Sequence, residues 1–132
     1  TAAVSGGGMY SEESSPRIVH CRFEGNTAER GGGMYIGEDS APRVIQCTFT
    51  SNVAVFSGGG IFNVSALPTI TACTIEANTS STGSGGGITN SASALTLSNS
   101  LVVDNFAQTE GGGIYNEISA PLVIVNCTVA GM

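Results

Sequence analysis

The residues with the clearest chemical potential are acidic side chains in two short stretches of the chain that lie 26 residues apart. Glu12 and Glu13 occupy the first stretch, and Glu38 and Asp39 occupy the second. If the two stretches stack as neighbouring turns, four carboxylates meet, and carboxylate oxygens are the ligands that Ca²⁺ prefers. The simpler interpretation is a solvated turn with mild repulsion between like charges. We treat these four residues as candidate calcium ligands, and we predict no other metal site and no cofactor.

Aromatic side chains recur one position after an apolar residue that itself follows three glycines. This set comprises Tyr10, Tyr35, Phe62 and Tyr115. Because side chains alternate along a strand, the rings face outward if the preceding Met or Ile faces the core. The rings then form a candidate contact face for sugar rings or for another protein. Alternatively, like side chains on adjacent parallel strands stack on one another and shield the sheet.

The same outer face lacks the groups that polysaccharide cleavage needs. The third glycines of the repeated triplets are expected there beside the aromatic rings, and they are Gly8, Gly33, Gly60, Gly87 and Gly113. A glycosidase needs two carboxylates about the scissile bond. A lyase needs a base, commonly with calcium held by acidic oxygens. Since this face holds no acidic or basic side chain, we expect no catalytic residues and no enzyme activity.

Threonines form a further surface pattern, with Thr48, Thr74 and Thr128 in one set and Thr69, Thr71 and Thr96 in another. Regular threonine arrays on a flat surface suit ice binding. Arginines and a leucine interrupt these rows, so the preference of threonine for strands explains them more simply. Ice binding remains a remote alternative.

The elements that position these residues are repeats marked by glycine triplets. Five triplets contain fifteen of the nineteen glycines, and successive triplets start 25, 27, 27 and 26 residues apart. A period of this size is typical of a solenoid, in which each repeat buries its apolar face against its neighbours. The glycines therefore belong to a periodic architecture, and a flexible linker is excluded.

Each repeat is expected to contain three short strands. In the first repeat these are 6–10, 17–19 and 21–23, with a bend at His20 and a loop over 24–30. Parallel stacking of such repeats predicts one all-β domain over residues 1–132, a right-handed parallel β-helix of about five coils of ~26 residues. The right hand follows from the handedness of parallel crossovers. The domain is expected to be a fragment or a subunit with open ends.

Two inward ladders are predicted from the same register. An asparagine follows the last inward apolar residue by three positions, at Asn26, Asn52, Asn78 and Asn105. Asparagine tolerates left-handed backbone and can bond the stacked copy in the next coil.

The second ladder consists of Cys21, Cys47, Cys73 and Cys127, and Ser100 takes the equivalent position in the fourth repeat. These thiols are either free and buried or joined in disulfides between adjacent coils. Cys127 would lie roughly 10 Å from Cys73, which is too far for a disulfide. His20 is the only histidine, so a zinc site has no ligand set.

The composition of the chain limits the classes of partner that it can bind. The 132 residues carry a net charge of −6 and only four basic side chains, which excludes a phosphate-binding stripe for nucleic acid. No apolar run reaches the ~20 residues of a membrane-spanning helix. Small polar residues and the repeat architecture favour an extracellular or cell-surface location.

The paired motifs GGG[MI] and FxxN resemble the repeats of right-handed β-helix proteins at bacterial surfaces. They are similar to the motifs of chlamydial polymorphic outer-membrane proteins, and to repeats of large secreted proteins with a pectate-lyase-like fold. The resemblance covers essentially the whole chain and implies the fold; its members include adhesins, passenger domains, stalks and enzymes. This chain departs from it in having Gly as the third triplet residue and in keeping the Phe of FxxN only in the first two coils.

We therefore expect a non-catalytic structural or adhesive β-helix: a rigid surface spacer, an adhesin repeat or a self-assembling filament subunit. Its expected partners are other copies of itself, end to end or side by side, a glycan or a host or cell-surface protein. The alternative is a module that binds or degrades carbohydrate with the outer face of its first sheet.

Overall fold

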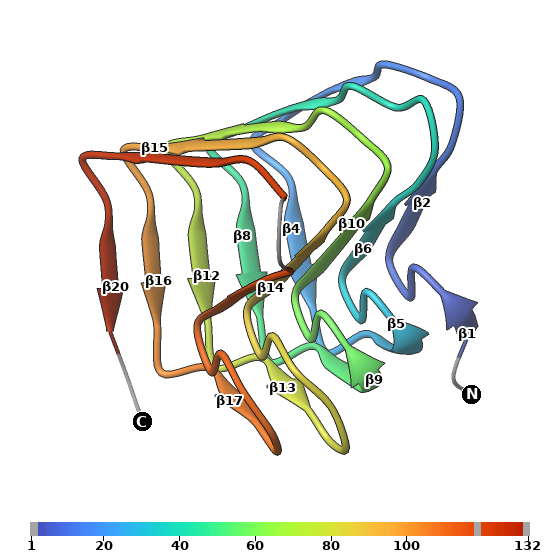
Figure 1. Cartoon of the computed structure of the whole chain (residues 1–132), viewed down its shortest axis with the longest axis vertical. Helices are drawn as coiled ribbons and strands as arrows, with labels where there is room; N and C mark the ends of the chain where they lie inside the picture. Colours follow the sequence, from blue (N-terminus) through green and yellow to red (C-terminus); the bar gives the residue numbers. More distant parts are fainter. Residues whose placement is uncertain (1–2, 118–119, 131–132) are drawn as a thin grey trace.

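The chain forms a parallel β-solenoid in a computed structural model that describes residues 3–117 and 120–130. The described residues contain twenty short strands and no helix, and therefore none that could cross a membrane. The strands form four parallel sheets of five strands each. Figure 1 shows the coils stacked side by side, from the N-terminal coil in blue to the C-terminal coil in red.

Each pass around the solenoid visits the four sheets in turn, which we name A to D. Sheet A contains β1 (Ala3–Ser5), β5 (Thr27–Arg30), β9 (Val53–Ser57), β13 (Thr79–Ser80) and β17 (Phe106–Ala107). Sheet B contains β2 (Met9–Ser11), β6 (Met34–Ile36), β10 (Ile61–Val64), β14 (Ile88–Ser91) and β18 (Ile114–Asn116). Sheet C contains β3 (Arg17–Val19), β7 (Arg43–Ile45), β11 (Thr69–Thr71), β15 (Leu95–Ser98) and β19 (Leu122–Val125). Sheet D contains β4 (Arg22–Glu24), β8 (Thr48–Thr50), β12 (Thr74–Glu76), β16 (Leu101–Val103) and β20 (Thr128–Ala130).

The predicted all-β parallel solenoid is confirmed, and the three strands expected in each repeat correspond to sheets B, C and D. The structure adds sheet A, where the sequence predicted a loop at 24–30. In this sheet β5 pairs with β9, and the fully buried inward residues are Ala28 and Ala54. A strand whose only inward apolar residue is an alanine carries almost no hydrophobic alternation, so the pattern did not predict it.

The core consists of inward columns that run from coil to coil. Sheet B contributes Met34, Ile61 and Ile88; sheet C contributes Val44, Ile70 and Leu97; and sheet D contributes Phe49, Ile75 and Val102, all of them fully buried. Phe23 stacks on Phe49 with ring centroids 4.8 Å apart. These inward residues were predicted from alternation within each strand, and the structure confirms them.

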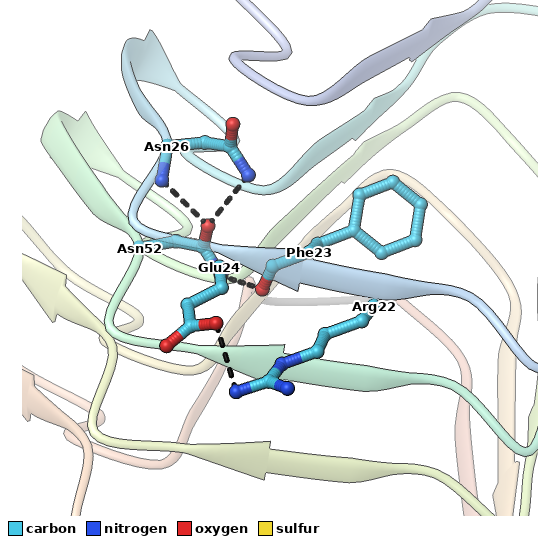
Figure 2. Close-up of polar contacts among 5 residues, drawn as sticks. All are labelled: Arg22, Phe23, Glu24, Asn26 and Asn52. Carbon is cyan, nitrogen blue, oxygen red and sulfur yellow. Dashed lines mark hydrogen bonds and ion pairs between the residues drawn. The ribbon is translucent and has the colours of Figure 1, made fainter.

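The asparagine ladder is a continuous hydrogen-bonded stack, drawn at its first step in Figure 2. The Asn52 Oδ1 accepts hydrogen bonds from the backbone N–H and the Nδ2 of Asn26, at 3.0 and 3.1 Å. The Asn52 Nδ2 donates to the Phe23 carbonyl and to the Asn78 Oδ1, both at 2.9 Å. Asn52 therefore uses both donors and both lone pairs of its amide while completely buried, and Asn78 repeats the pattern.

The ladder was predicted, and the bonding of each asparagine to its stacked copy is confirmed, but the left-handed backbone expected at the asparagines is wrong. The residues with left-handed backbone are those immediately before the asparagines, namely Gly25, Ser51, Ala77 and Asp104. Asparagine is required here for its amide, because a buried carboxamide can bond the coils on both sides. The bend predicted at His20 is confirmed, since His20 and the equivalent Gln46 have φ of 56° and 53°.

A second column of inward polar side chains lies in sheet B, and fewer of its polar atoms have hydrogen-bond partners. Asn63 pairs in register with Asn90, which pairs with Asn116. The Asn90 Nδ2 donates to the Asn116 Oδ1 at 2.7 Å. Asn63 is fully buried, yet neither its Oδ1 nor its Nδ2 has a hydrogen-bond partner among the described residues. The coil before it places Ile36 at the same position.

The first four glycine triplets leave no room for a side chain at any of their three positions. Gly31 has a φ of +66°, which disfavours other residues. A Cβ on Gly32 would lie 2.4 Å from the Gly59 carbonyl oxygen, and one on Gly33 would lie 2.7 Å from that of Gly60 and 3.2 Å from the Asn52 Nδ2. The expectation that the third glycines form an outer face is therefore wrong, because their missing side chains point toward the asparagine ladder.

All four cysteines are free, and the thiols act as corner hydrogen-bonding groups. The Cys47 Sγ accepts the Cys21 N–H at 3.4 Å, and the Cys73 Sγ accepts the Cys47 N–H at 3.5 Å. The Ser100 Oγ accepts the Cys73 N–H at 3.1 Å, which explains why serine replaces cysteine at this position. Burial raises the pKa of the Cys73 thiol to about 11, so it stays protonated at neutral pH. Cys127 donates its thiol hydrogen to the Val125 carbonyl at 3.3 Å.

The two asparagine columns predict opposite responses to the same substitution. Asn78→Leu leaves buried partners in the coils on both sides unpaired, and we expect a loss of at least ~3 kcal/mol in the free energy of unfolding. Asn63→Leu removes two unpaired buried atoms, and we expect a gain of about 1 kcal/mol. Urea unfolding followed by circular dichroism measures both. Equal destabilisation by the two variants would contradict this account of the columns.

Candidate binding site

The pocket described by the structure lies where sheet B meets its following turn. It has a volume of about 320 Å³ and is lined by Tyr10, Glu12, Tyr35, Gly37, Glu38, Val64 and Ser65. These residues come from three successive coils, through β2, β6, β10 and the residues that follow each of them. The volume is at the small end of the range for ligand pockets.

Tyr10 and Tyr35 of the aromatic column form one wall of this pocket. Tyr10, Tyr35 and Phe62 pair in register on adjacent strands. The ring centroids of Tyr10 and Tyr35 are 5.0 Å apart at an interplanar angle of 1°, and those of Tyr35 and Phe62 are 5.4 Å apart at 11°. Both faces of the Tyr35 ring are thus covered by neighbours. The stacking confirms the alternative predicted from the sequence, in which like side chains on adjacent strands stack on one another, and Tyr35 offers its edge and hydroxyl group to a ligand in place of a flat ring face.

Tyr115 does not join the other three rings. It pairs with Thr89, which separates it from Phe62 along the sheet. Thr89 is buried, and its hydroxyl donates to the Ser84 carbonyl at 3.0 Å. Phe62 itself is only 8% exposed. Of the four predicted contact residues, the structure brings only Tyr10 and Tyr35 to the pocket.

The pocket gains its charge from the turn that follows sheet B. The Tyr10 hydroxyl donates to the Glu12 Oε1 at 2.5 Å. This hydrogen bond, followed by desolvation and the nearby charge of Glu12, raises the pKa of Tyr10 to about 12. Burial raises the pKa of Tyr35 as well, with smaller contributions from the charges of Glu12 and Glu38 and an opposing one from Arg30. Both phenols are therefore neutral at neutral pH, and the negative charge lies on the two glutamates.

The four candidate calcium ligands are not brought together. Glu12 and Glu38 line the pocket, whereas Glu13 and Asp39 do not. Glu13 and Asp39 have left-handed backbone, with φ of 52° and 58°, which turns the chain between successive side chains. In the parts of the chain that the structure describes, no group of three or more His, Cys, Asp or Glu side chains could hold a metal ion.

The other charged and threonine-bearing surfaces are regular outer columns. Sheet D aligns Arg22, Thr48, Thr74, Leu101 and Thr128. Sheet C aligns Arg17, Arg43, Thr69, Thr96 and Val123. Neither column places more than two threonines side by side. The Arg22 Nη2 lies 2.8 Å from the Glu24 Oε1, an exposed ion pair of small energetic weight drawn in Figure 2.

The sequence had placed the tyrosines and the acidic turns at separate sites, and the structure combines them. The missed signal was spacing along the chain. Glu12 follows Tyr10 by two residues, directly after the end of β2, and Glu38 lies 26 residues after Glu12, so its place follows from the coil-to-coil register. No pattern in the sequence predicted that Val64 and Ser65 would line the pocket, because their positions depend on the path of the chain at the end of β10.

One family model matches the chain, described as "Right handed beta helix region", over residues 1–131. Comparison with curated proteins and with solved structures found no significant match to the chain.

The hydrogen bond between Tyr10 and Glu12 predicts a late tyrosine titration. We expect Tyr10 to ionise near pH 12, because its hydroxyl proton is held by a carboxylate and its phenolate would be repelled by it. Glu12→Gln removes that charge, and the pKa of Tyr10 should then fall toward the usual value of about 10. The Tyr10 ring can be followed by NMR across a pH series. Glu13→Gln is the matched control, and an unchanged Tyr10 titration in Glu12→Gln would contradict the assignment.

Proposed function

Because this chain belongs to the right-handed β-helix family, we propose that it is a non-catalytic structural and adhesive module that acts outside the cell or at its surface. The observation that carries this proposal is the unbroken coil-to-coil stacking of buried columns. Apolar side chains and fully bonded asparagines repeat at the same positions in successive coils. Such a solenoid is rigid along its axis, which suits a spacer or an adhesin repeat that holds a surface in a fixed orientation.

The second candidate is glycan binding at the sheet B pocket. A small concave site with two carboxylates, two phenols and Ser65 is suited to hydrogen-bonding a hydroxylated ligand. Stacking of a sugar on Tyr35 is disfavoured, because neighbouring rings cover both faces of that ring. Binding would therefore depend on hydrogen bonds at the ring edges and turns.

Cleavage by elimination is disfavoured by the chemistry of the pocket, and the polysaccharide panel below tests hydrolysis by its two carboxylates. The Tyr10 phenol keeps its proton well above neutral pH, so it does not serve as the base of an elimination. The Tyr10 hydroxyl donates a hydrogen bond to Glu12, an arrangement that orients both side chains. The pocket lining holds no histidine, lysine or arginine.

A polysaccharide panel tests the absence of catalysis. We expect the chain to release neither new reducing ends nor unsaturated uronates from any member of the panel, while a glycan array or a cell-binding assay reports adhesion. The Glu12→Gln variant is the negative control and gives the background level of both products. Product formed by the unaltered chain and lost in Glu12→Gln would show an enzyme and refute the proposal.

Self-association is the partner interaction that we propose for this module. Ile124 aligns with Ile70 and Leu97, which are fully buried, yet Ile124 is 43% exposed. A second copy stacked on this coil would bury Ile124 and extend the parallel sheets, as further coils of the same chain would.

Sedimentation velocity over a concentration series tests this association. We expect the 132-residue chain to form larger species as concentration rises, and Ile124→Lys to suppress them because it places a charge in the contact. Val123→Lys is the matched control, since Val123 lies on the adjacent outward position and is 51% exposed. A chain that stays monomeric at high concentration would contradict the proposal.

A further inference from the structure

The sheet B pocket has a negative electrostatic character. Glu12 and Glu38 lie on adjacent coils, and their charges act on both tyrosines of the wall. The cation whose charge acts on Tyr35 is Arg30; its guanidinium lies 5.1 Å from the centroid of the Phe56 ring, and Arg30 does not line the pocket. A site of this sign repels uronates and other acidic sugars, and it attracts a cation.

The polarity of the lining indicates what kind of cation fits. Val64 is the only aliphatic side chain among the lining residues, and the others offer carboxylate, phenol or hydroxyl groups or, at Gly37, bare backbone. An aliphatic ammonium would find little apolar surface for its carbon chain. A bare metal ion would find only two carboxylates, fewer than such an ion takes as ligands. A hydroxylated ligand can satisfy the remaining polar groups.

The stacking of the rings decides between types of organic cation. Quaternary ammonium groups are recognised over the faces of aromatic rings. Here Tyr35 is covered on both faces by Tyr10 and Phe62, at centroid distances of 5.0 and 5.4 Å, and Tyr10 is covered on one, so the pocket cannot form a cage of several ring faces. A primary ammonium group needs no ring face, because it donates three hydrogen bonds, and carboxylates and phenol oxygens accept them.

We propose that this pocket binds the primary ammonium group of an unacetylated amino sugar within a glycan. Glu12 and Glu38 pair with the ammonium group. The hydroxyl groups of Ser65 and of the two tyrosines form hydrogen bonds with the hydroxyl groups of the sugar ring. The small volume of about 320 Å³ suits one sugar residue of a longer chain. The proposal rests on the glycan binding proposed above for this pocket and names the class of glycan that the site selects.

Isothermal titration calorimetry of the full chain with two short oligosaccharides tests the proposal. One is an oligomer of glucosamine, and the other is the same oligomer fully N-acetylated, which keeps the rings but loses the positive charge. We expect the glucosamine oligomer to bind at least about tenfold more tightly, since it alone makes charge-assisted hydrogen bonds. Its affinity should also fall as salt is added, because the carboxylates are partly exposed.

Glu38→Gln should weaken binding of the glucosamine oligomer by about tenfold, since it removes one carboxylate while keeping the shape of the side chain. Glu76→Gln is the matched control on the exposed side of β12, far from the lining residues, and should leave affinity unchanged. Circular dichroism establishes that both variants are folded.

Equal binding of the two oligomers, or full affinity in Glu38→Gln, would overturn amino-sugar recognition and leave glycan adhesion standing. Binding of a lysine-rich peptide in place of the glucosamine oligomer would also overturn it. Failure of every sugar on a broad glycan array would remove glycan adhesion itself, and the inference with it.

Discussion

The hydrogen-bonded stack of Asn26, Asn52, Asn78 and Asn105 is the interaction on which the register of the coils depends. Each interior amide donates to the amide of the next coil and to a backbone carbonyl of the previous one. The buried asparagine of one coil therefore needs both neighbouring coils to complete its hydrogen bonds. A slip of one residue would leave several buried groups unpaired, each costing about 1–3 kcal/mol. The glycines beside the ladder enforce the same register sterically, because a Cβ at Gly33 would collide with the carbonyl oxygen of Gly60.

The binding pocket is a consequence of that register. Only when the coils stack in line do Tyr10, Tyr35 and Phe62 lie ring on ring, and only then does Glu38 come beside the Tyr10 and Glu12 pair. The stack orients the tyrosines and closes both faces of Tyr35 to a ligand, which leaves hydroxyl groups and carboxylates as the main binding groups. The scaffold therefore determines the type of recognition as well as its position.

The two columns of buried asparagines in the solenoid are not equally well hydrogen-bonded. The ladder of Asn52 and Asn78 is completely bonded, whereas the amide of Asn63 in sheet B is buried without partners among the described residues. The two columns show that asparagine stabilises the core only where its neighbours are placed to accept and donate. Cysteine and serine at the corner between sheets C and D satisfy the same requirement with a single thiol or hydroxyl, as at Cys73 and Ser100.

The sequence by itself determined the repeat, the inward columns, the asparagine and cysteine ladders and the bend at His20. These features recur at a fixed period, and alternation along a strand then assigns each residue to one face. The tertiary structure decided the rest, beginning with sheet A, where Ala28 gives no hydrophobic pattern. It also decided that Gly33 faces the ladder, and that Glu12 and Glu38 reach the pocket while Glu13 and Asp39 do not. These outcomes depend on left-handed residues at the turns and on contacts between coils, which no local pattern encodes.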